Sequence, residues 1–212
     1  MLFADVIRQL NTAFQRELPG AKAQAALAPV PRREWPEGFN PARVRHAAGL
    51  LLVFPLCARA HIVLTVRSDT LDRHSGQVSL PGGVVEPGET FEQAALREAN
   101  EEVALALDGI SVLGTLTPID IPVSGFRLHP IVAAGRERPA MAPADGEVAR
   151  ILEVPVADLV NRDALRSTTR VRDGRSYHVP AFHAQGFEIW GATAMVLAEF
   201  LALLGWRPET GL

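Results

Sequence analysis

Two neighbouring apolar runs in the first half of the chain constrain its fold most strongly. Residues 47–54 and 61–67 are short and rich in valine, leucine and isoleucine, and a break containing Pro55 separates them. Runs of this length and composition are typical of buried strands, and the short break predicts that the two strands pair. Strands and helical segments follow one another without an internal repeat, so the chain is expected to be a mixed α/β sandwich.

Helical periodicity marks both ends of the chain. Apolar residues recur at three- and four-residue steps from Phe3 to Leu18, which predicts an amphipathic helix closed by Pro19 and Gly20. A second helix is expected from about Thr90, and a last one over residues 192–204. Further strands are expected near residues 110–116, 126–133, 148–154 and 177–182.

The alanine- and proline-rich stretch of residues 21–41 reads as an irregular connector. The expected division is therefore an N-terminal helix with its connector, residues 1–41, followed by one domain over residues 42–212.

Composition excludes several classes of function. The net charge of −3 shows no basic surface for nucleic acid, so no nucleic-acid partner is expected. Cys57 is the single cysteine, which rules out an internal disulfide and a cysteine-based zinc site and fits a reducing compartment. The N-terminus does not read as a signal peptide, and no apolar stretch is long enough for a bilayer. A cytoplasmic protein without a membrane partner is expected, and its oligomeric state is left open.

Three carboxylates fall on one face of the expected middle helix. Glu98, Glu101 and Glu102 stand at i, i+3 and i+4, so they lie within one turn and repel one another. Taken alone, such a cluster is most often a solvated face. Here a glycine turn at Gly82 and Gly83 precedes the helix and lets the backbone approach a ligand, while hard oxygen ligands suit Mg²⁺. The pattern therefore predicts a site for a divalent cation.

This stretch resembles the Nudix box, G-x5-E-x7-R-E-U-x-E-E-x-G-U, in which U is apolar. Ala104 departs from it, because it stands where the box has its last glycine. Either Ala104 adopts the left-handed conformation, at a cost of about 1 to 2 kcal/mol, or the helix runs on to Gly109. The positions in register are Gly83, Glu89, Arg97, Glu98, Ala99, Glu101, Glu102 and Leu105.

The segment before the box, residues 63–83, is similar to the signature of coenzyme A pyrophosphatases, L-L-T-x-R-S-x3-R-x3-G-x3-F-P-G-G. Three positions depart from it: Val63, Asp72 and Leu80. Asp72 reverses a charge where a cation suits a phosphate, although the adjacent Arg73 compensates. Residues 118–133 and 189–197 also resemble that branch. The positions that match are Leu64, Thr65, Arg67, Ser68, Gly76, Pro81, Gly82 and Gly83.

The resemblance implies a Nudix-type α/β/α sandwich around a mixed sheet and a hydrolase that uses Mg²⁺ or Mn²⁺. Metal ligands would be Glu98, Glu101 and Glu102, and the general base Glu98 or Glu147. Arg97 and Arg67 would orient a carboxylate or bind phosphate, and Gly82 and Gly83 would lie against the substrate.

Coenzyme A as substrate would give 4'-phosphopantetheine and adenosine 3',5'-bisphosphate. The alternatives are a pyrophosphatase for NADH or ADP-ribose and a non-catalytic nucleotide sensor. Glu147 is equally well an exposed loop acid. His74, His129 and Trp190 are expected to be packing or loop residues.

Overall fold

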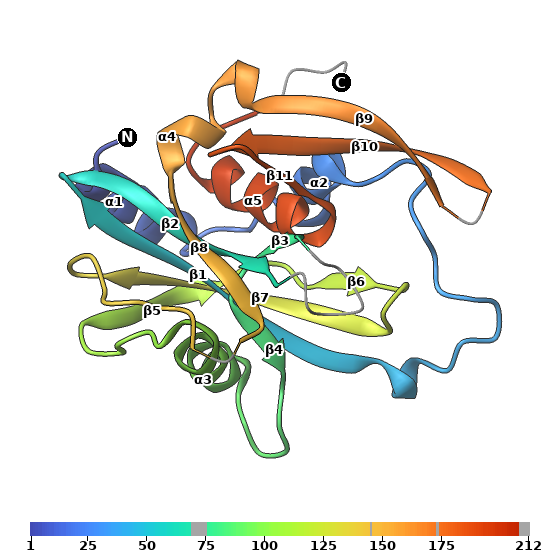
Figure 1. Ribbon diagram of the computed structural model, residues 1–212, viewed down its shortest axis with the longest axis horizontal. Coiled ribbons are helices and arrows are strands. Elements are labelled where there is room, and N and C mark those ends of the chain that lie inside the picture. The colour runs from blue at the N-terminus through green and yellow to red at the C-terminus, as the bar shows by residue number, and fades with distance from the viewer. Residues whose placement is uncertain (69–75, 145, 173, 208–212) are drawn as a thin grey trace.

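The computed structural model describes residues 1–68, 76–144, 146–172 and 174–207. Runs of strands along it are separated by helices (Figure 1). The helices are α1 (Phe3–Ala13), α2 (Gly20–Gln24), α3 (Phe91–Val103), α4 (Val156–Leu159) and α5 (Gly191–Leu203), with 3₁₀ turns η1 (Ala25–Leu27), η2 (Pro41–Arg43) and η3 (Arg162–Ala164). The strands are β1 (Arg45–Leu56), β2 (Arg59–Arg67), β3 (Val78–Ser79), β4 (Gly82–Val84), β5 (Ile110–Thr115), β6 (Ile119–Ile121), β7 (Phe126–Gly135), β8 (Val148–Pro155), β9 (Leu165–Arg172), β10 (Arg175–Ala184) and β11 (Phe187–Trp190).

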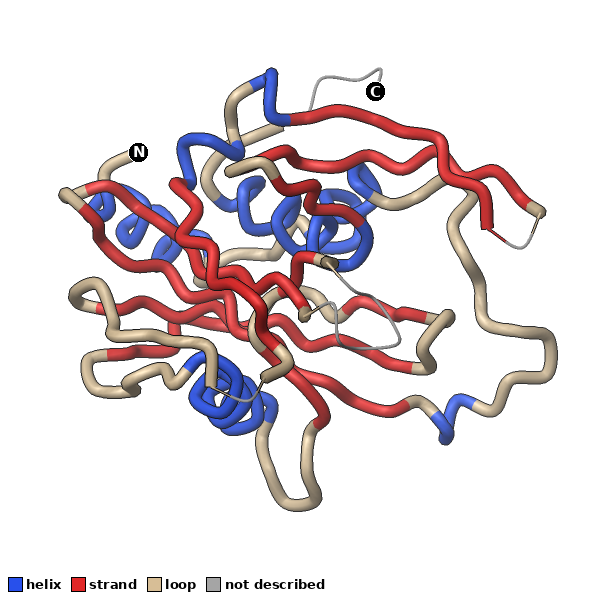
Figure 2. The backbone as a smooth tube through the Cα atoms, in the orientation of Figure 1, coloured by secondary structure: helices blue, strands red, loops and turns tan. Residues whose placement is uncertain are grey.

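Eight strands of the described chain form one mixed sheet around β1 (Figure 2). β1 runs parallel to β7 and antiparallel to β2, which confirms the predicted pairing of the first two apolar runs. β8 extends the sheet beyond β2, while β5 and β6 pair with β7. Because β1 is paired along both edges and covered on both faces, its residues 48–54 are all buried.

The strands β1 and β2 part at one end, and a short segment fills the gap between them. β2 pairs with β1 near its own start and with β3 at Thr65 and Val66. Along the edge where β1 leaves β2, it pairs instead with β4, so that Gly49 lies opposite Gly82. The amide of Leu50 also donates to the carbonyl of Pro81 (2.8 Å). The predicted glycine turn therefore lies inside the sheet, in the gap where β1 and β2 separate.

Helices cover both faces of this sheet, which confirms the expected α/β/α arrangement (Figure 1). On one face, Leu50, Leu52 and Phe54 share a core with α3 residues such as Ala95. On the other face, the alternate β1 residues share a core with α1 and α5. No described helix is both long and apolar enough to cross a membrane.

A second, smaller sheet lies beyond α5 (Figure 1). It consists of β9, β10 and β11 in antiparallel order. The N-terminal connector reaches its side: Val30 and His178 exchange two backbone hydrogen bonds of 2.8 Å. Two segments far apart in the sequence are thereby joined at the edge of β10.

The structure corrects two predictions about the N-terminal region. Residues 21–41 are not wholly irregular, because α2 and η1 occupy their first part. The first helix ends at Ala13 rather than Leu18, since the amide of Gln15 bonds to the carbonyl of Thr12 in a tighter turn. Phe14, the next apolar residue of the pattern, lies just beyond the helix and packs over Gly114 of β5.

The smaller sheet was only partly foreseen. One strand was expected over residues 177–182, and β10 is longer than that, while β9 and β11 were missed altogether. The last helix agrees with the expected residues 192–204 to within one residue at each end.

Candidate active site

The helix α3 begins where the sequence predicted. Thr90 and Gln93 form a complete capping box: the Thr90 hydroxyl accepts from the Gln93 amide (3.1 Å), and the Gln93 side chain accepts from the Thr90 amide (2.8 Å). The two bonds satisfy amides that a helix start leaves without partners. The helix therefore starts at a fixed point after the glycine turn.

The end of α3 settles the alternative left open by Ala104. Ala104 has φ 48° and ψ 37°, the left-handed conformation that the box glycine would adopt, so the helix does not continue to Gly109. The side-chain amide of Asn100 donates to the backbone carbonyl of Leu105 (2.9 Å). The backbone amide of Ala142 donates to the backbone carbonyl of Val103 (2.9 Å). These bonds hold the turn in spite of the cost of about 1 to 2 kcal/mol.

Both glycines of the turn lie where a side chain has no room. A Cβ atom on Gly82 would stand 2.3 Å from the carbonyl oxygen of Ala48 on β1. A Cβ atom on Gly83 would stand 2.4 Å from Oε2 of Glu98. The absence of side chains thus allows β4 to lie close to β1 and the Glu98 carboxylate to pack directly on the backbone.

Arg97 joins three carboxylates at the start and middle of α3. Its guanidinium donates from Nε (2.7 Å) and Nη2 (3.1 Å) to both oxygens of Glu89, and from Nη1 to Glu98 (3.0 Å) and Glu101 (2.9 Å). Nη2 also donates to the carbonyl of Val84 (3.0 Å). The hydrogen bonds to Glu89 raise the pKa of Arg97 and lower that of Glu89. The geometry favours an orienting role for Arg97 over phosphate binding.

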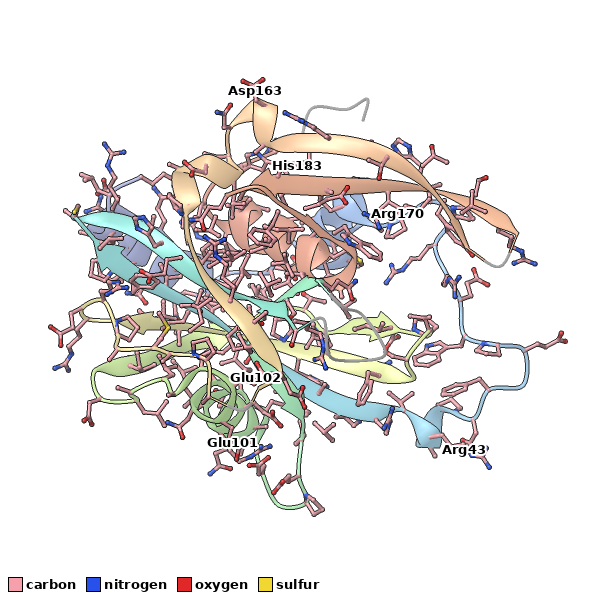
Figure 3. All side chains as sticks on the ribbon, viewed as in Figure 1. Arg43, Glu101, Glu102, Asp163, Arg170 and His183 are labelled. Carbon is pink, nitrogen blue, oxygen red and sulfur yellow. The ribbon has the colours of Figure 1, made fainter. Side chains whose placement is uncertain are left out.

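The carboxylates of Glu98 and Glu102 have different surroundings. Burial raises the pKa of Glu98, and the hydrogen bond from Arg97 opposes this shift. Glu102 is 8% exposed, and one of its oxygens accepts from the amide of Gly82 (3.2 Å). Glu101 and Glu102 both project from α3 in Figure 3.

As they stand, the described side chains form no group of three acidic, histidine or cysteine residues around a common metal position. The donor set nevertheless fits a divalent cation. Glu98, Glu101 and Glu102 offer hard oxygen atoms, as Mg²⁺ prefers. Burial also penalises the charge on Glu98, and a nearby cation would relieve that penalty.

Glu147 and Arg67 meet at the adjoining ends of β2 and β8. Nη2 of Arg67 donates to Oε2 of Glu147 (3.1 Å), and the carbonyl of Glu147 accepts from the amide of Ser68 (2.7 Å). The loop before β8 is fastened to α3, because the amide of Ala144 donates to the carbonyl of Glu102 (3.0 Å). The fold thus brings the loop that carries Glu147 to the end of the acidic helix.

Comparison with known proteins agrees with this arrangement. The NUDIX domain model matches residues 47–173. A protein named Uncharacterized Nudix hydrolase NudL from Citrobacter koseri is 33% identical over 77% of this chain and 85% of its own. Another of that name from Klebsiella pneumoniae is 33% identical over 80% of this chain and 91% of its own.

The chain belongs to the Nudix hydrolase family. Its fold is also similar to that of a Nudix hydrolase from M. smegmatis, RenU, with a TM-score of 0.55 and 20% identity over 80% of this chain and 91% of that one. Nudix hydrolases cleave pyrophosphate bonds in small nucleotide-derived substrates and generally use divalent metals such as Mg²⁺.

A cavity of about 870 Å³ opens beside the Nudix glycines. This size lies within the range of small-molecule sites. Arg67, Gly82 and Gly83, for which the sequence predicts substrate contacts, are among the residues that line it. Other parts of the wall come from the connector (Arg32 and Arg33), β1, β3, the β6 region, the smaller sheet and the start of α5. Nothing in the sequence marked Arg32 and Arg33, because only the folded chain brings the connector to this cavity.

Five further residues were singled out in the sequence, and the structure describes two of them, His129 and Trp190. Asp72, Arg73 and His74 lie outside the described residues. His129 is 7% exposed and stacks on Phe91 with ring centroids 3.6 Å apart, as expected of a packing residue. Its Nε2 lies 2.9 Å from Nδ1 of His46. Trp190 lines the cavity, and the guanidinium of Arg170 lies 4.4 Å from its ring centroid.

Proposed function

We propose that this Nudix hydrolase cleaves the pyrophosphate bond of coenzyme A or a derivative of it, with Mg²⁺ or Mn²⁺ as cofactor. The products would be 4'-phosphopantetheine and adenosine 3',5'-bisphosphate. The observation that carries the proposal is the contact of Glu98 with Gly83, a residue that lines a cavity large enough for a nucleotide. The coenzyme A assignment draws on the signature-like segment before the box, Leu64 to Gly83.

The carboxylates of Glu98, Glu101 and Glu102 would hold the metal. When bound there, a divalent cation would neutralise charge on the pyrophosphate and lower the pKa of a coordinated water. Arg97 holds Glu98 and Glu101 in position, and the amide of Gly82 holds Glu102.

Proton transfer and phosphate contact fall to residues around the cavity. Glu147, or Glu98, would take the proton of the attacking water. Water oxygen bonds to one phosphorus as the bond from that phosphorus to the bridging oxygen breaks, and the other phosphate leaves. Arg67 lines the cavity and donates to Glu147, which supports a role for its guanidinium in contacting a phosphate oxygen of the substrate.

The test is to incubate the purified protein with Mg²⁺ and, separately, coenzyme A, NADH, ADP-ribose and a nucleoside triphosphate. Chromatography resolves the products. We expect 4'-phosphopantetheine from coenzyme A as the dominant activity. Faster cleavage of NADH or ADP-ribose would overturn the substrate assignment and keep the chemistry. No cleavage of any pyrophosphate would favour a nucleotide sensor.

A further inference from the structure

The segment that joins β7 to β8 returns along the end of α3 (Figure 1). We call its residues 140–144 the strap. The amide of Ala142 donates to the carbonyl of Val103 (2.9 Å), and the amide of Ala144 donates to the carbonyl of Glu102 (3.0 Å). Carbonyls in the last turn of a helix have no partner within that helix, so the strap satisfies two of them. It is thereby tied to the helix that carries the proposed metal ligands.

Met141 fastens the strap to the core. Of the five strap residues, all of them described, Met141 alone is half-buried, and the other four are exposed. Its side chain packs against the core that α3 forms with the main sheet, whose buried members include Val103 and Leu105. A segment opens readily when few apolar contacts hold it, so this contact weighs heavily in keeping the strap against α3. Methionine suits such a place, because its unbranched side chain fills irregular gaps.

The strap leads directly to Glu147, which follows Ala144 by three positions. Because consecutive Cα atoms are about 3.8 Å apart, the Cα atoms of Ala144 and Glu147 lie within about 11 Å of each other. On its other side Glu147 is fixed to the end of β2. Its carbonyl accepts from the amide of Ser68 (2.7 Å), and its carboxylate accepts from Nη2 of Arg67 (3.1 Å). The place of Glu147 is therefore set between the strap and β2.

The surroundings of the two candidate bases favour Glu147 over Glu98. Glu98 accepts from Arg97 and is a proposed ligand of the metal, so its oxygen lone pairs are engaged. Glu147 has no part in the proposed metal site, and its side chain is 47% exposed. A carboxylate takes a proton from water only within hydrogen-bond reach of it, so a small displacement of Glu147 relative to the metal ligands would slow the reaction.

We propose that Met141 is a positioning residue for the hydrolysis: through the strap it holds Glu147 within hydrogen-bond reach of the attacking water. The inference rests on the proposed function and narrows its choice of base to Glu147. It does not depend on which pyrophosphate is the substrate, because the strap bears on the attacking water and not on the leaving group.

The experiment measures kcat and KM with Mg²⁺ and coenzyme A for the unmodified protein, Met141→Ala, Met141→Leu and Leu56→Ala. Leu56 is the matched control, because its half-buried side chain packs against the same core from the end of β1. We expect Met141→Ala to lower kcat roughly tenfold with KM unchanged, since the base is displaced while the substrate contacts stay. Met141→Leu keeps the apolar volume and should restore most of the rate. A loss of kcat per folded molecule from Leu56→Ala equal to that from Met141→Ala would overturn the inference.

A double-variant cycle separates positioning from a general loosening of the fold. Glu147→Gln should lower kcat roughly a hundredfold. In that background Met141→Ala should cause no further loss, because the base that the strap positions is gone. The same tenfold loss in both backgrounds would overturn the inference. Near-native kcat in Glu147→Gln would overturn it too, by removing the base on which it rests.

Amide hydrogen exchange tests the strap without substrate or turnover. Met141→Ala should speed exchange at the amides of Ala142 and Ala144 while the amides inside α3 stay protected, and Leu56→Ala should not. Unchanged exchange at the two strap amides would overturn the inference. If another pyrophosphate is cleaved in place of coenzyme A, the substrate assignment alone fails, and the same variants are compared with that substrate. Absence of any cleavage would overturn the proposed function and the inference with it, whereas the cycle and exchange results overturn the inference alone.

Discussion

A single carboxylate on α5 and a pair of carboxylates on α3 differ in what surrounds them. Glu199 on α5 is fully buried, and its oxygens accept from the side chain of Gln24 (2.7 Å), the hydroxyl (2.7 Å) and amide of Thr117 and the amide of Gly20 (3.2 Å). By contrast, Glu98 and Glu101 on α3 share the single guanidinium of Arg97. A buried carboxylate satisfied by neutral groups holds elements together, whereas carboxylates that share one cation remain open to another.

This contrast predicts that the largest effect on catalysis comes from α3. Glu98→Gln and Glu102→Gln should each lower turnover at least about a hundredfold, since the change removes negative charge from the proposed metal site. The free energy of unfolding should change little. Turnover at saturating Mg²⁺ and urea unfolding are measured together. Near-native rates in either variant would refute the assignment of the site.

Glu199→Gln should show the opposite behaviour. Replacing one carboxylate oxygen by an NH₂ group sets a donor against the donors of Gln24, Thr117 and Gly20 at a fully buried position. We expect a loss of about 2 kcal/mol in the free energy of unfolding, with turnover per folded molecule nearly unchanged. Urea unfolding and active-site titration separate the two quantities. A loss of turnover without a loss of stability would break the distinction between the two groups.

Gly83→Ala tests the contact between the glycine turn and the Glu98 carboxylate on α3. The added methyl group would lie 2.4 Å from Oε2 of Glu98, so one of the two must move. We expect a loss of stability of about 1 kcal/mol together with reduced turnover. In the Glu98→Ala background the obstructing carboxylate is gone, and the same substitution should cost less stability. Equal costs in the two backgrounds would show that the contact with Glu98 is not the cause.

The smallest expected effect on stability at neutral pH comes from substituting His129, a buried side chain beside α3. Burial, with the nearby charges of His46 and Arg127, lowers the pKa of His129 to about 4. As the pH falls from about 6.5 toward 4, the unfolded chain takes up a proton that the folded chain does not, so stability is lost over this range. His129→Gln should make that loss shallower, and the exposed His178→Gln should not. Urea unfolding at pH 7 and pH 5 checks the difference.

What the sequence could predict depended on how local the determining interactions are. The acidic helix, its capping box and the glycine turn all lie within residues 82–105, and their spacing alone placed them correctly. Glu199 gave no such signal, because its hydrogen-bond partners come from α2 and from Thr117, which lies between β5 and β6. Arg32 and Arg33 gave none either, since they are brought into place by the pairing of Val30 with His178, two residues that lie far apart in the sequence. Periodicity describes one element at a time and carries no information about such distant neighbours.

The pairing of Val30 with His178 also bears on how this protein could diverge. Both residues lie outside the span of residues 47–173 that matches the Nudix model, as do Arg32, Arg33, Tyr177 and Trp190. The acidic helix and its glycines lie wholly inside that span. Mutations in the flanking segments could therefore retune substrate choice during evolution while the inherited hydrolytic machinery stays under its own, separate selection.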